Sequence, residues 1–278
     1  MVGDEALAAR RRRYAAQIAA WGRGFGFDDP RVEAAFAAVP REACLTPPPW
    51  RVFAPGGLFE ETTSDPAKLY EDVLVVLDGA RGINNGQPSL HAAWMMAISP
   101  QAGETAVHIG AGSGYYTAIL AELVEGTGRV EAYEIERDLA ERARCNLRPW
   151  PQVQVHARSA LDGIPPADVV YASAAAAAPP AAWLEALAPG GRLIFPWQPS
   201  GRHGVTLRVE RTGSGFSARA AFGVSFIPCA GLPAGAVSRL PAVDLARTRS
   251  IWLRADREPD DTALAVYDDL WCSSAEAA

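Results

Sequence analysis

The chain has 278 residues, of which 49% are hydrophobic, and its 26 basic and 32 acidic side chains give a formal net charge of −6. This length and apolar content allow one large α/β domain with additions or two small domains. The acidic balance argues against non-specific binding to nucleic acid, which needs a basic surface. The arginine cluster at 10–13 is the local exception, and we interpret it as the solvated face of a helix.

Cysteine, histidine and apolar patterns exclude further classes of protein. The four cysteines lie far apart without a C-x-x-C pair, which argues against a zinc site or a disulfide framework and fits a reducing cytosol. The four histidines show no metal-ligand spacing. No signal peptide is indicated, and the richest apolar stretch, 174–188, is broken by prolines and a glutamate. We therefore expect a cytoplasmic protein with no metal, membrane span or nucleic-acid partner; its oligomeric state stays open.

The first hundred residues combine predicted helices with long loops. Asp29 is placed to cap one helix, with Pro30 at its first position. A stretch rich in proline, glycine and threonine follows and predicts a loop. In chain order, the predicted elements are helix 5–20, helix 29–39, loop 46–68, strand 73–77, loop 79–88 and helix 89–98.

Strands and helices then alternate, a pattern typical of βαβ units and a parallel sheet. The pattern changes after Pro196, where two strands of a hairpin are predicted, and the residues from 233 onward are weakly patterned. The predicted strands are 105–109, 129–135, 153–156, 168–172, 192–195, 205–210, 217–226 and 250–254; the predicted helices are 115–124, 137–147 and 180–187.

The segment AVHIGAGSGYY, at 106–116, joins an apolar strand to a helix through three glycines at alternate positions. Glycines allow the backbone to turn sharply and to approach a ligand without a Cβ atom in the way. The start of the following helix supplies unpaired N–H groups and a partial positive charge. In nucleotide-binding sheets, ligands lie outside the carboxyl end of such a strand. The segment therefore predicts a cofactor-binding loop.

The spacing of this loop distinguishes between cofactors. Glu134 follows Gly114 by twenty residues, near the end of the next predicted strand, where a carboxylate can accept both ribose hydroxyls. A dinucleotide site would need glycine at Tyr115. A nucleophilic serine elbow would need glycine at Ala111. The G-x-G-x-G form is instead typical of S-adenosylmethionine sites, so we predict this cofactor.

Several linked motifs resemble the protein-L-isoaspartate O-methyltransferase family over about residues 10–232. In chain order they are DPRVEAAFAAVPRE at 29–42, YED at 70–72, QP at 87–88, IGAGSGY at 109–115, the stretch from Glu134 through 139–147, and LAPGGRLIFP at 187–196. The resemblance implies an α/β, Rossmann-like methyltransferase fold with a mostly parallel sheet and helices on both faces. An N-terminal helical segment and a β-rich C-terminal extension would be added to it.

Four departures from the family pattern concern the acceptor and the cofactor. When this chain is aligned with the family on Gln87, Gly86 stands at the position of the family's active-site hydroxyl. His108 stands at the position of the acid that starts the family's glycine loop. Its "GDG" beside the adenine becomes the sequence at 158–160, and the tail from Pro233 exceeds the family core.

We expect polar side chains of the loop before the helix at 89–98 to orient the acceptor in place of the lost hydroxyl: Asn84, Asn85, Gln87 and Ser89. We expect the cofactor to contact the glycine loop, the acid and the adenine segment: His108, Gly110, Ala111, Gly112, Ser113, Gly114, Tyr115, Glu134, Ser159 and Ala160.

Structural interpretations compete with these roles. Residues 84–86 fit a turn with positive φ, and Ser89 fits a helix N-cap. His91 and His108 are more typical of packed or hydrogen-bonded histidines than of ligand contacts. Asp72 and its neighbour Glu71 fit solvated side chains.

The resemblance implies an S-adenosylmethionine-dependent O-methyltransferase that acts on isoaspartyl carboxylates of proteins or peptides, as in protein repair. Two alternatives stay open: a methyltransferase of the same ancestry with another acceptor, and a cofactor-binding protein without turnover. We expect three regions: an N-terminal segment with the acceptor loop at 1–100, the methyltransferase core at 101–232 and a C-terminal extension at 233–278.

Overall fold

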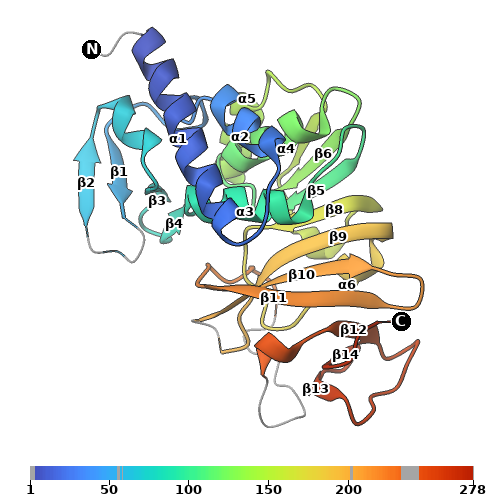
Figure 1. Cartoon of the computed structure of the whole chain (residues 1–278). Helices are drawn as coiled ribbons and strands as arrows, with labels where there is room; N and C mark the ends of the chain where they lie inside the picture. Colours follow the sequence, from blue (N-terminus) through green and yellow to red (C-terminus); the bar gives the residue numbers. More distant parts are fainter. Residues whose placement is uncertain (1–3, 55–56, 58, 201–202, 233–243, 278) are drawn as a thin grey trace. The chain divides into compact units, whose positions relative to one another are not determined.

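The computed structural model describes residues 4–54, 57, 59–200, 203–232 and 244–277 (Figure 1). The chain forms two compact units, each built from separate stretches of sequence. The first comprises the residues up to Glu104 together with Ala111–Ala157, and the second comprises Thr105–Gly110 together with the residues from Arg158 onward. The expected regions 1–100, 101–232 and 233–278 follow chain order and stay a prediction.

Three helices pack together in the first unit: α1 (Asp4–Gly24), α2 (Pro30–Ala38) and α3 (Pro88–Ile98) (Figure 1). The predicted start of α2 is confirmed, because the Asp29 side chain accepts a hydrogen bond from the Arg31 N–H at 3.0 Å and Pro30 is the first helical residue. The three predicted helices in this part of the chain are all present, with ends shifted by a few residues.

A small antiparallel sheet in the first unit corrects the predicted loop at 46–68. Its strands, in the order β2-β1-β3-β4, are β1 (Trp50–Phe53), β2 (Glu60–Thr63), β3 (Leu74–Asp78) and β4 (Ile83–Asn84). The buried Trp50 and Val52 alternate with the exposed Arg51 and the half-buried Phe53, and they pack against Leu69 and Val75. Such short strands in a stretch rich in proline and glycine give almost no periodicity, and tertiary packing decides their conformation.

The remainder of the first unit alternates helix and strand as predicted. Its elements are α4 (Tyr115–Val124), β6 (Arg129–Tyr133), α5 (Arg137–Asn146) and β7 (Val153–His156). Strands β6 and β7 pair in parallel. Two short 3₁₀ helices, η1 (Glu42–Cys44) and η2 (Pro66–Tyr70), complete this unit.

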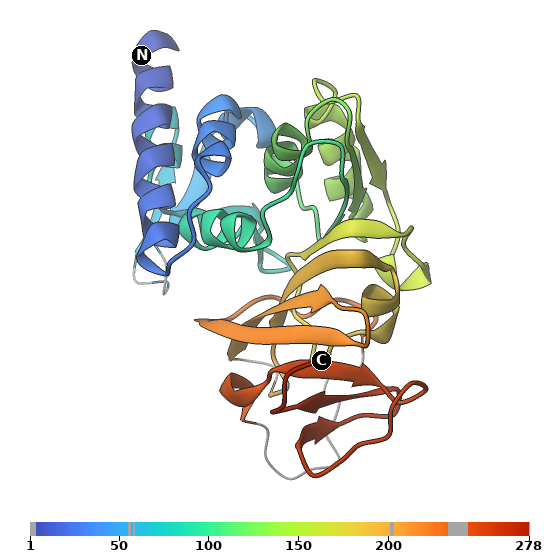
Figure 2. The ribbon, with the colours of Figure 1, turned by 45° about the vertical axis from the view of Figure 1, so that its right-hand side comes forward.

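The second unit is dominated by one run of strands (Figure 2). Strand β8 (Ala167–Ala172) pairs in parallel with both β5 (Thr105–Ile109) and β9 (Leu187–Trp197). The following pairings, from β9 outward, are antiparallel and involve β10 (Gly204–Arg211), β11 (Phe216–Val224), β12 (Ser250–Leu253), β14 (Leu270–Ser273) and β13 (Ala263–Val266). Helical segments are η3 (Ala160–Asp162), α6 (Ala181–Glu185) and η4 (Leu245–Arg247).

The α/β class with parallel pairing of the central strands is therefore confirmed, as is a β-rich C-terminal extension. Within the described residues, no helix is both long and apolar enough to span a membrane. The predicted strand at 250–254 is present, but β13 and β14 were missed. These two strands have four residues each, and neither alternates buried with exposed positions, so the sequence gives no period-two signal there.

The extension β12–β14 has its own small core. Trp252, Val266 and Trp271 are buried and pack together, and the two indole rings are stacked with centroids 6.5 Å apart. The Arg257 guanidinium lies over the Trp252 ring, 4.5 Å from its centroid. The backbone oxygen of Arg257 accepts a hydrogen bond from Trp271 Nε1 at 2.9 Å. The last strand is therefore anchored by one large side chain.

We predict that Trp271→Ala destabilises the protein by about 3–5 kcal/mol, the usual range for emptying a fully buried tryptophan site. Chemical unfolding followed by circular dichroism measures this change. Ile227→Ala, at a side chain that is 41% exposed in the same unit, is the control and should stay within about 0.5 kcal/mol of the parent chain. Equal effects of the two changes would contradict the anchoring role of Trp271.

Candidate cofactor and acceptor site

The glycine loop at 110–114 has the backbone shape that its sequence predicts. Gly112 and Gly114 have φ angles of +56° and +98°, which favour glycine. A Cβ atom on Gly112 would lie 3.0 Å from Leu77 Cδ1, and one on Gly114 would lie 2.9 Å from Leu147 Cδ1. Gly114 also caps the N-terminus of α4. The loop is thus a cradle that side chains would fill.

Glu134, directly after β6, holds this loop in place. Its Oε2 atom accepts a hydrogen bond from the Gly112 N–H at 2.7 Å, and its Oε1 atom accepts one from the Glu136 N–H at 3.0 Å. The residue is 7% exposed, and burial raises the pKa of its carboxyl group, although these backbone hydrogen bonds oppose the shift. Each carboxylate oxygen can accept a further hydrogen bond. The cradle and this acid therefore fit an adenosyl group.

Two other residues of the loop face the protein interior. Ser113 is buried, and its carbonyl oxygen accepts a hydrogen bond from Asn146 Nδ2 at 2.9 Å. The Tyr115 ring packs against Phe36, with centroids 6.1 Å apart, and lies under the Arg41 guanidinium. These contacts are typical of a packed aromatic side chain, and cofactor contacts of Ser113 and Tyr115 stay predictions.

Three further predicted cofactor residues belong to the second unit: His108, Ser159 and Ala160. His108 on β5 is 1% exposed and lies 3.0 Å from Ser173 Oγ through its Nε2 atom, as expected for a hydrogen-bonded core histidine. Burial lowers the pKa of His108 to about 3, so the ring is neutral. Ser159 caps η3 by accepting a hydrogen bond from the Leu161 N–H, and Ala160 is buried. Their contacts with a cofactor stay predictions.

The acceptor loop at 84–89 starts with the predicted turn. The Asn84 Oδ1 atom accepts a hydrogen bond from the Gly86 N–H at 2.9 Å, and Gly86 has a φ angle of +76°. Asn85 is buried, and its Oδ1 atom accepts hydrogen bonds from the Val75 N–H at 2.8 Å and from Arg41 at 3.2 Å. Asn85 Nδ2 has no hydrogen-bond partner among the described residues. This amide is a buried donor that a ligand can satisfy.

Asp72 organises the end of the acceptor loop, a role that the sequence did not reveal. One oxygen of its carboxylate accepts hydrogen bonds from Ser89 Oγ at 2.7 Å and Gln87 Nε2 at 2.9 Å, and the other accepts the Ser89 N–H at 2.9 Å. The N-cap interpretation of Ser89 is wrong, because α3 begins at Pro88 and its N-cap residue is Gln87. The Ser89 N–H at the start of the helix donates instead to the carboxylate of Asp72. The YED motif at 70–72 contains Asp72 and was the feature of the sequence that could have indicated its role.

Arg41 is the second residue that sequence reasoning missed. Its side chain is completely buried and donates hydrogen bonds to the carbonyl oxygens of Leu69 at 2.7 Å and Val73 at 2.5 Å, as well as to Asn85. It therefore joins the segment that carries Asp72 to the acceptor loop. Arg41 belongs to the VPRE motif at 39–42, but the motif does not show which residues Arg41 contacts.

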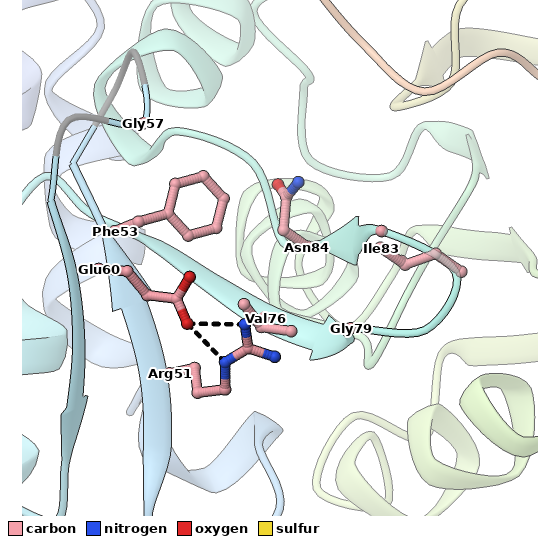
Figure 3. A pocket seen from close by; sticks show the side chains of 9 residues that line it. Arg51, Phe53, Gly57, Glu60, Val76, Gly79, Ile83 and Asn84 are labelled. Carbon is pink, nitrogen blue, oxygen red and sulfur yellow. Dashed lines mark hydrogen bonds and ion pairs between the residues drawn. The ribbon is translucent and has the colours of Figure 1, made fainter.

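An open pocket of about 250 Å³ lies beside the acceptor loop in the first unit (Figure 3). Asn84 contributes to its wall, together with apolar side chains of the small sheet. Arg51 and Glu60 in this pocket pair with each other at 2.6 Å, as the dashed lines in Figure 3 show. Because its charged groups are mutually satisfied, the pocket offers space beside Asn84 but no reactive group.

The parallel strands, the glycine cradle and the acid after β6 define an S-adenosylmethionine-dependent methyltransferase. The family model for protein-L-isoaspartate(D-aspartate) O-methyltransferase matches residues 59–233. The chain belongs to this family.

Individual relatives agree with the family match. A protein-L-isoaspartate O-methyltransferase from Aeropyrum pernix is 34% identical over 72% of this chain and 73% of its own length. One from Burkholderia mallei is 34% identical over 68% of this chain, which spans only 54% of that protein. The fold resembles a solved protein-L-isoaspartate O-methyltransferase with a TM-score of 0.66 and 20% identity, over 93% of this chain and 87% of that chain.

We predict that Glu134→Gln weakens binding of S-adenosylhomocysteine by about 10- to 100-fold, because hydrogen bonds to a charged acceptor contribute about 1.5–3 kcal/mol. The amide also turns an N–H group toward one of the two backbone donors. Isothermal calorimetry measures the affinity, with the exposed Glu141→Gln on α5 as the control. Unchanged affinity in Glu134→Gln would contradict the assignment of this acid.

The buried, neutral His108 predicts a loss of stability in acid. Its pKa is about 3 in the folded chain against 6.5 for an exposed histidine, so the unfolded state binds the extra proton. Stability should therefore fall as the pH drops below about 6.5, by up to about 1.4 kcal/mol per pH unit until about pH 3.

The variant His108→Gln removes this contribution, whereas the exposed His203→Gln retains it. Urea unfolding at about pH 7.5 and about pH 5 should show a smaller acid-induced loss for His108→Gln than for His203→Gln. The same loss in both variants would show that His108 is not the group responsible.

Proposed function

We propose that this protein transfers the methyl group of S-adenosylmethionine to the carboxylate of isoaspartyl residues in proteins or peptides. The observation that carries the proposal is the hydrogen bond from the Gly112 N–H to Glu134, within a chain of this family. The acceptor loop at 84–89 belongs to the same unit as this cradle and supports the assignment.

The proposed reaction needs positioning more than proton transfer. S-adenosylmethionine supplies an electrophilic methyl group, and an ionised carboxylate attacks it without help from a strong base. The protein must therefore hold the acceptor in line and exclude water. Glu134 and the glycine loop would hold the adenosyl end, and the polar groups of 84–89 would orient the acceptor.

The orienting groups differ in how firmly they are held. Asp72 keeps Gln87 and Ser89 in place, so these two side chains can present fixed hydrogen-bonding groups. Asn85 adds a buried amide donor, which is costly by about 1–3 kcal/mol when unpaired. Asn84 shapes the turn and lines the neighbouring pocket. We assign acceptor orientation to these four residues, with Asp72 and Arg41 as positioning residues.

A second candidate function is methylation of a different carboxylate, for example in a modified peptide. Gly86 stands where the family hydroxyl is expected, and the β12–β14 extension adds surface beyond the family match at 59–233. A cofactor-binding protein without turnover is a third candidate. We also propose that the protein is cytoplasmic, because its scattered cysteines fit a reducing compartment.

Incubation with labelled S-adenosylmethionine tests the proposal. The substrate is an isoaspartyl peptide, and its matched control is the same peptide with ordinary aspartate. We expect base-labile label only in the isoaspartyl peptide, since a carboxyl methyl ester is hydrolysed by base. Absence of label despite measured binding of S-adenosylhomocysteine would overturn the isoaspartyl assignment and leave the other two candidates.

We predict that Asp72→Asn lowers kcat/KM for the isoaspartyl peptide by about 10- to 100-fold, through loss of charged hydrogen bonds to Gln87 and Ser89. Affinity for S-adenosylhomocysteine should stay unchanged, because Asp72 does not contact the glycine cradle in any described hydrogen bond. The exposed Asp261→Asn is the control for both measurements. Full activity of Asp72→Asn would show that Asp72 does not position the acceptor site.

A further inference from the structure

The hairpin of β3 and β4 leads directly into the acceptor loop and also lies against the glycine loop. Asn85, the first residue after β4, donates its N–H to the Val75 carbonyl oxygen at 3.0 Å, and its Oδ1 atom accepts the Val75 N–H at 2.8 Å. Farther along β3, Leu77 Cδ1 lies 3.0 Å from the position that a Cβ atom on Gly112 would occupy. The hairpin is therefore one piece of backbone that joins the acceptor loop to the cofactor cradle.

Arg81, in the turn of this hairpin, forms ion pairs with three carboxylates. Its Nε atom donates to Asp78 Oδ2 at 2.6 Å and its backbone N–H donates to Asp78 Oδ1 at 3.0 Å, which closes the turn. The rest of the guanidinium reaches the start of α5, where Nη2 donates to Asp138 Oδ2 at 2.7 Å and Nη1 donates to the Glu136 carboxylate. Hydrogen bonds from Arg81 lower the pKa of the Asp138 carboxyl group, so this pair is ionised. One side chain thus ties the hairpin to the helix.

The start of α5 is also where the cofactor acid is anchored. Glu136 is the N-cap residue of α5, and its backbone N–H donates to Glu134 Oε1 at 3.0 Å. Arg81 therefore binds the side chain of the same residue whose backbone holds Glu134. A role in closing the turn would need Asp78 alone, whereas the two partners on α5 lie 55 and 57 positions away in the chain.

We propose that Arg81 is a positioning residue that fixes the acceptor loop at a set distance from the cofactor cradle. The inference rests on the proposed function and deepens it, because in-line transfer of a methyl group needs donor and acceptor held closely in place. A displacement of about 1 Å can lower the rate of a reaction by about 100-fold. An isolated exposed ion pair contributes little, but one guanidinium shared by three carboxylates forms a network. In this role Arg81 acts through the hairpin and contacts neither acceptor nor cofactor.

The variant Arg81→Gln tests the inference, and Arg137→Gln is its matched control. Arg137 is exposed in the first turn of α5 and forms no ion pair within the part of the chain that the structure describes. We expect Arg81→Gln to lower the single-turnover rate of methyl transfer to an isoaspartyl peptide by at least about tenfold, with both substrates saturating. Its affinity for S-adenosylhomocysteine should change by less than about threefold, since the hydrogen bonds of Glu134 remain. Neither quantity should change in Arg137→Gln.

Salt and a conservative variant give readouts that a merely structural role would not move. The range over which charges interact falls from about 10 Å at 0.1 M salt to about 3 Å at 1 M. The transfer rate of the parent chain should therefore fall over this range toward that of Arg81→Gln, whose own rate should change less. Arg81→Lys keeps the charge without the planar fork, so its rate should lie between the two. A merely structural role predicts a lower melting temperature with an unchanged transfer rate.

The outcomes separate this inference from the proposed function. An unchanged transfer rate in Arg81→Gln, or an equal loss in Arg137→Gln, overturns the role of Arg81 and leaves the proposed function standing. A loss confined to S-adenosylhomocysteine affinity also overturns it, because Arg81 would then act on the cradle alone. A parent chain that binds S-adenosylhomocysteine but does not methylate the peptide overturns the proposed function and the inference with it. A loss of rate that is specific to Arg81 and that high salt reproduces in the parent chain supports the inference.

Discussion

One hydrogen bond supports the rest of the site: the Gly112 N–H donates to the buried carboxylate of Glu134 at 2.7 Å. Burying a carboxylate is costly unless donors satisfy it, and here two backbone N–H groups do so. The same bond holds the glycine loop in a conformation with positive φ angles, which favour glycine. Loop geometry and acid position are thus set together.

The acceptor loop depends on a comparable arrangement, but its partners are remote in sequence. Arg41 binds the backbone oxygens of Leu69 and Val73, on either side of Asp72 in the chain, and Asp72 binds the start of α3. A buried arginine bonded to carbonyl oxygens and an amide satisfies groups that would otherwise be costly to bury. The polar side chains at 84–89 are therefore held by a network and not by the loop alone.

The sequence predicted those features whose signals are local. The strand at Thr105–Ile109, the glycine loop and the helix from Tyr115 follow one another directly, and the acid at 134 comes at the end of the next strand. Apolar runs bounded by glycine turns are enough to place such elements. The family motifs also located the residues 70–72 and 29–42, although not their contacts.

The features that escaped prediction depend on tertiary structure. Strands β1 and β2 have four residues each; β1 packs through Trp50 and Val52 against Leu69 and Val75, and β2 pairs with β1. The partners of Asp72 and Arg41 lie 15 to 44 positions away, beyond any spacing rule. The contacts of Arg81 with the start of α5 likewise span 55 and 57 positions. No linear pattern reports such a juxtaposition.

A crystal structure of the complex with S-adenosylhomocysteine would show whether Glu134 and the glycine loop hold the cofactor. We expect the ribose hydroxyls to bind the Glu134 carboxylate and the amino-acid end to lie along the glycine loop. The sulfur should face the loop at 84–89. A bound ligand that makes no contact with Glu134, or whose sulfur faces away from that loop, would show that the site is assigned wrongly.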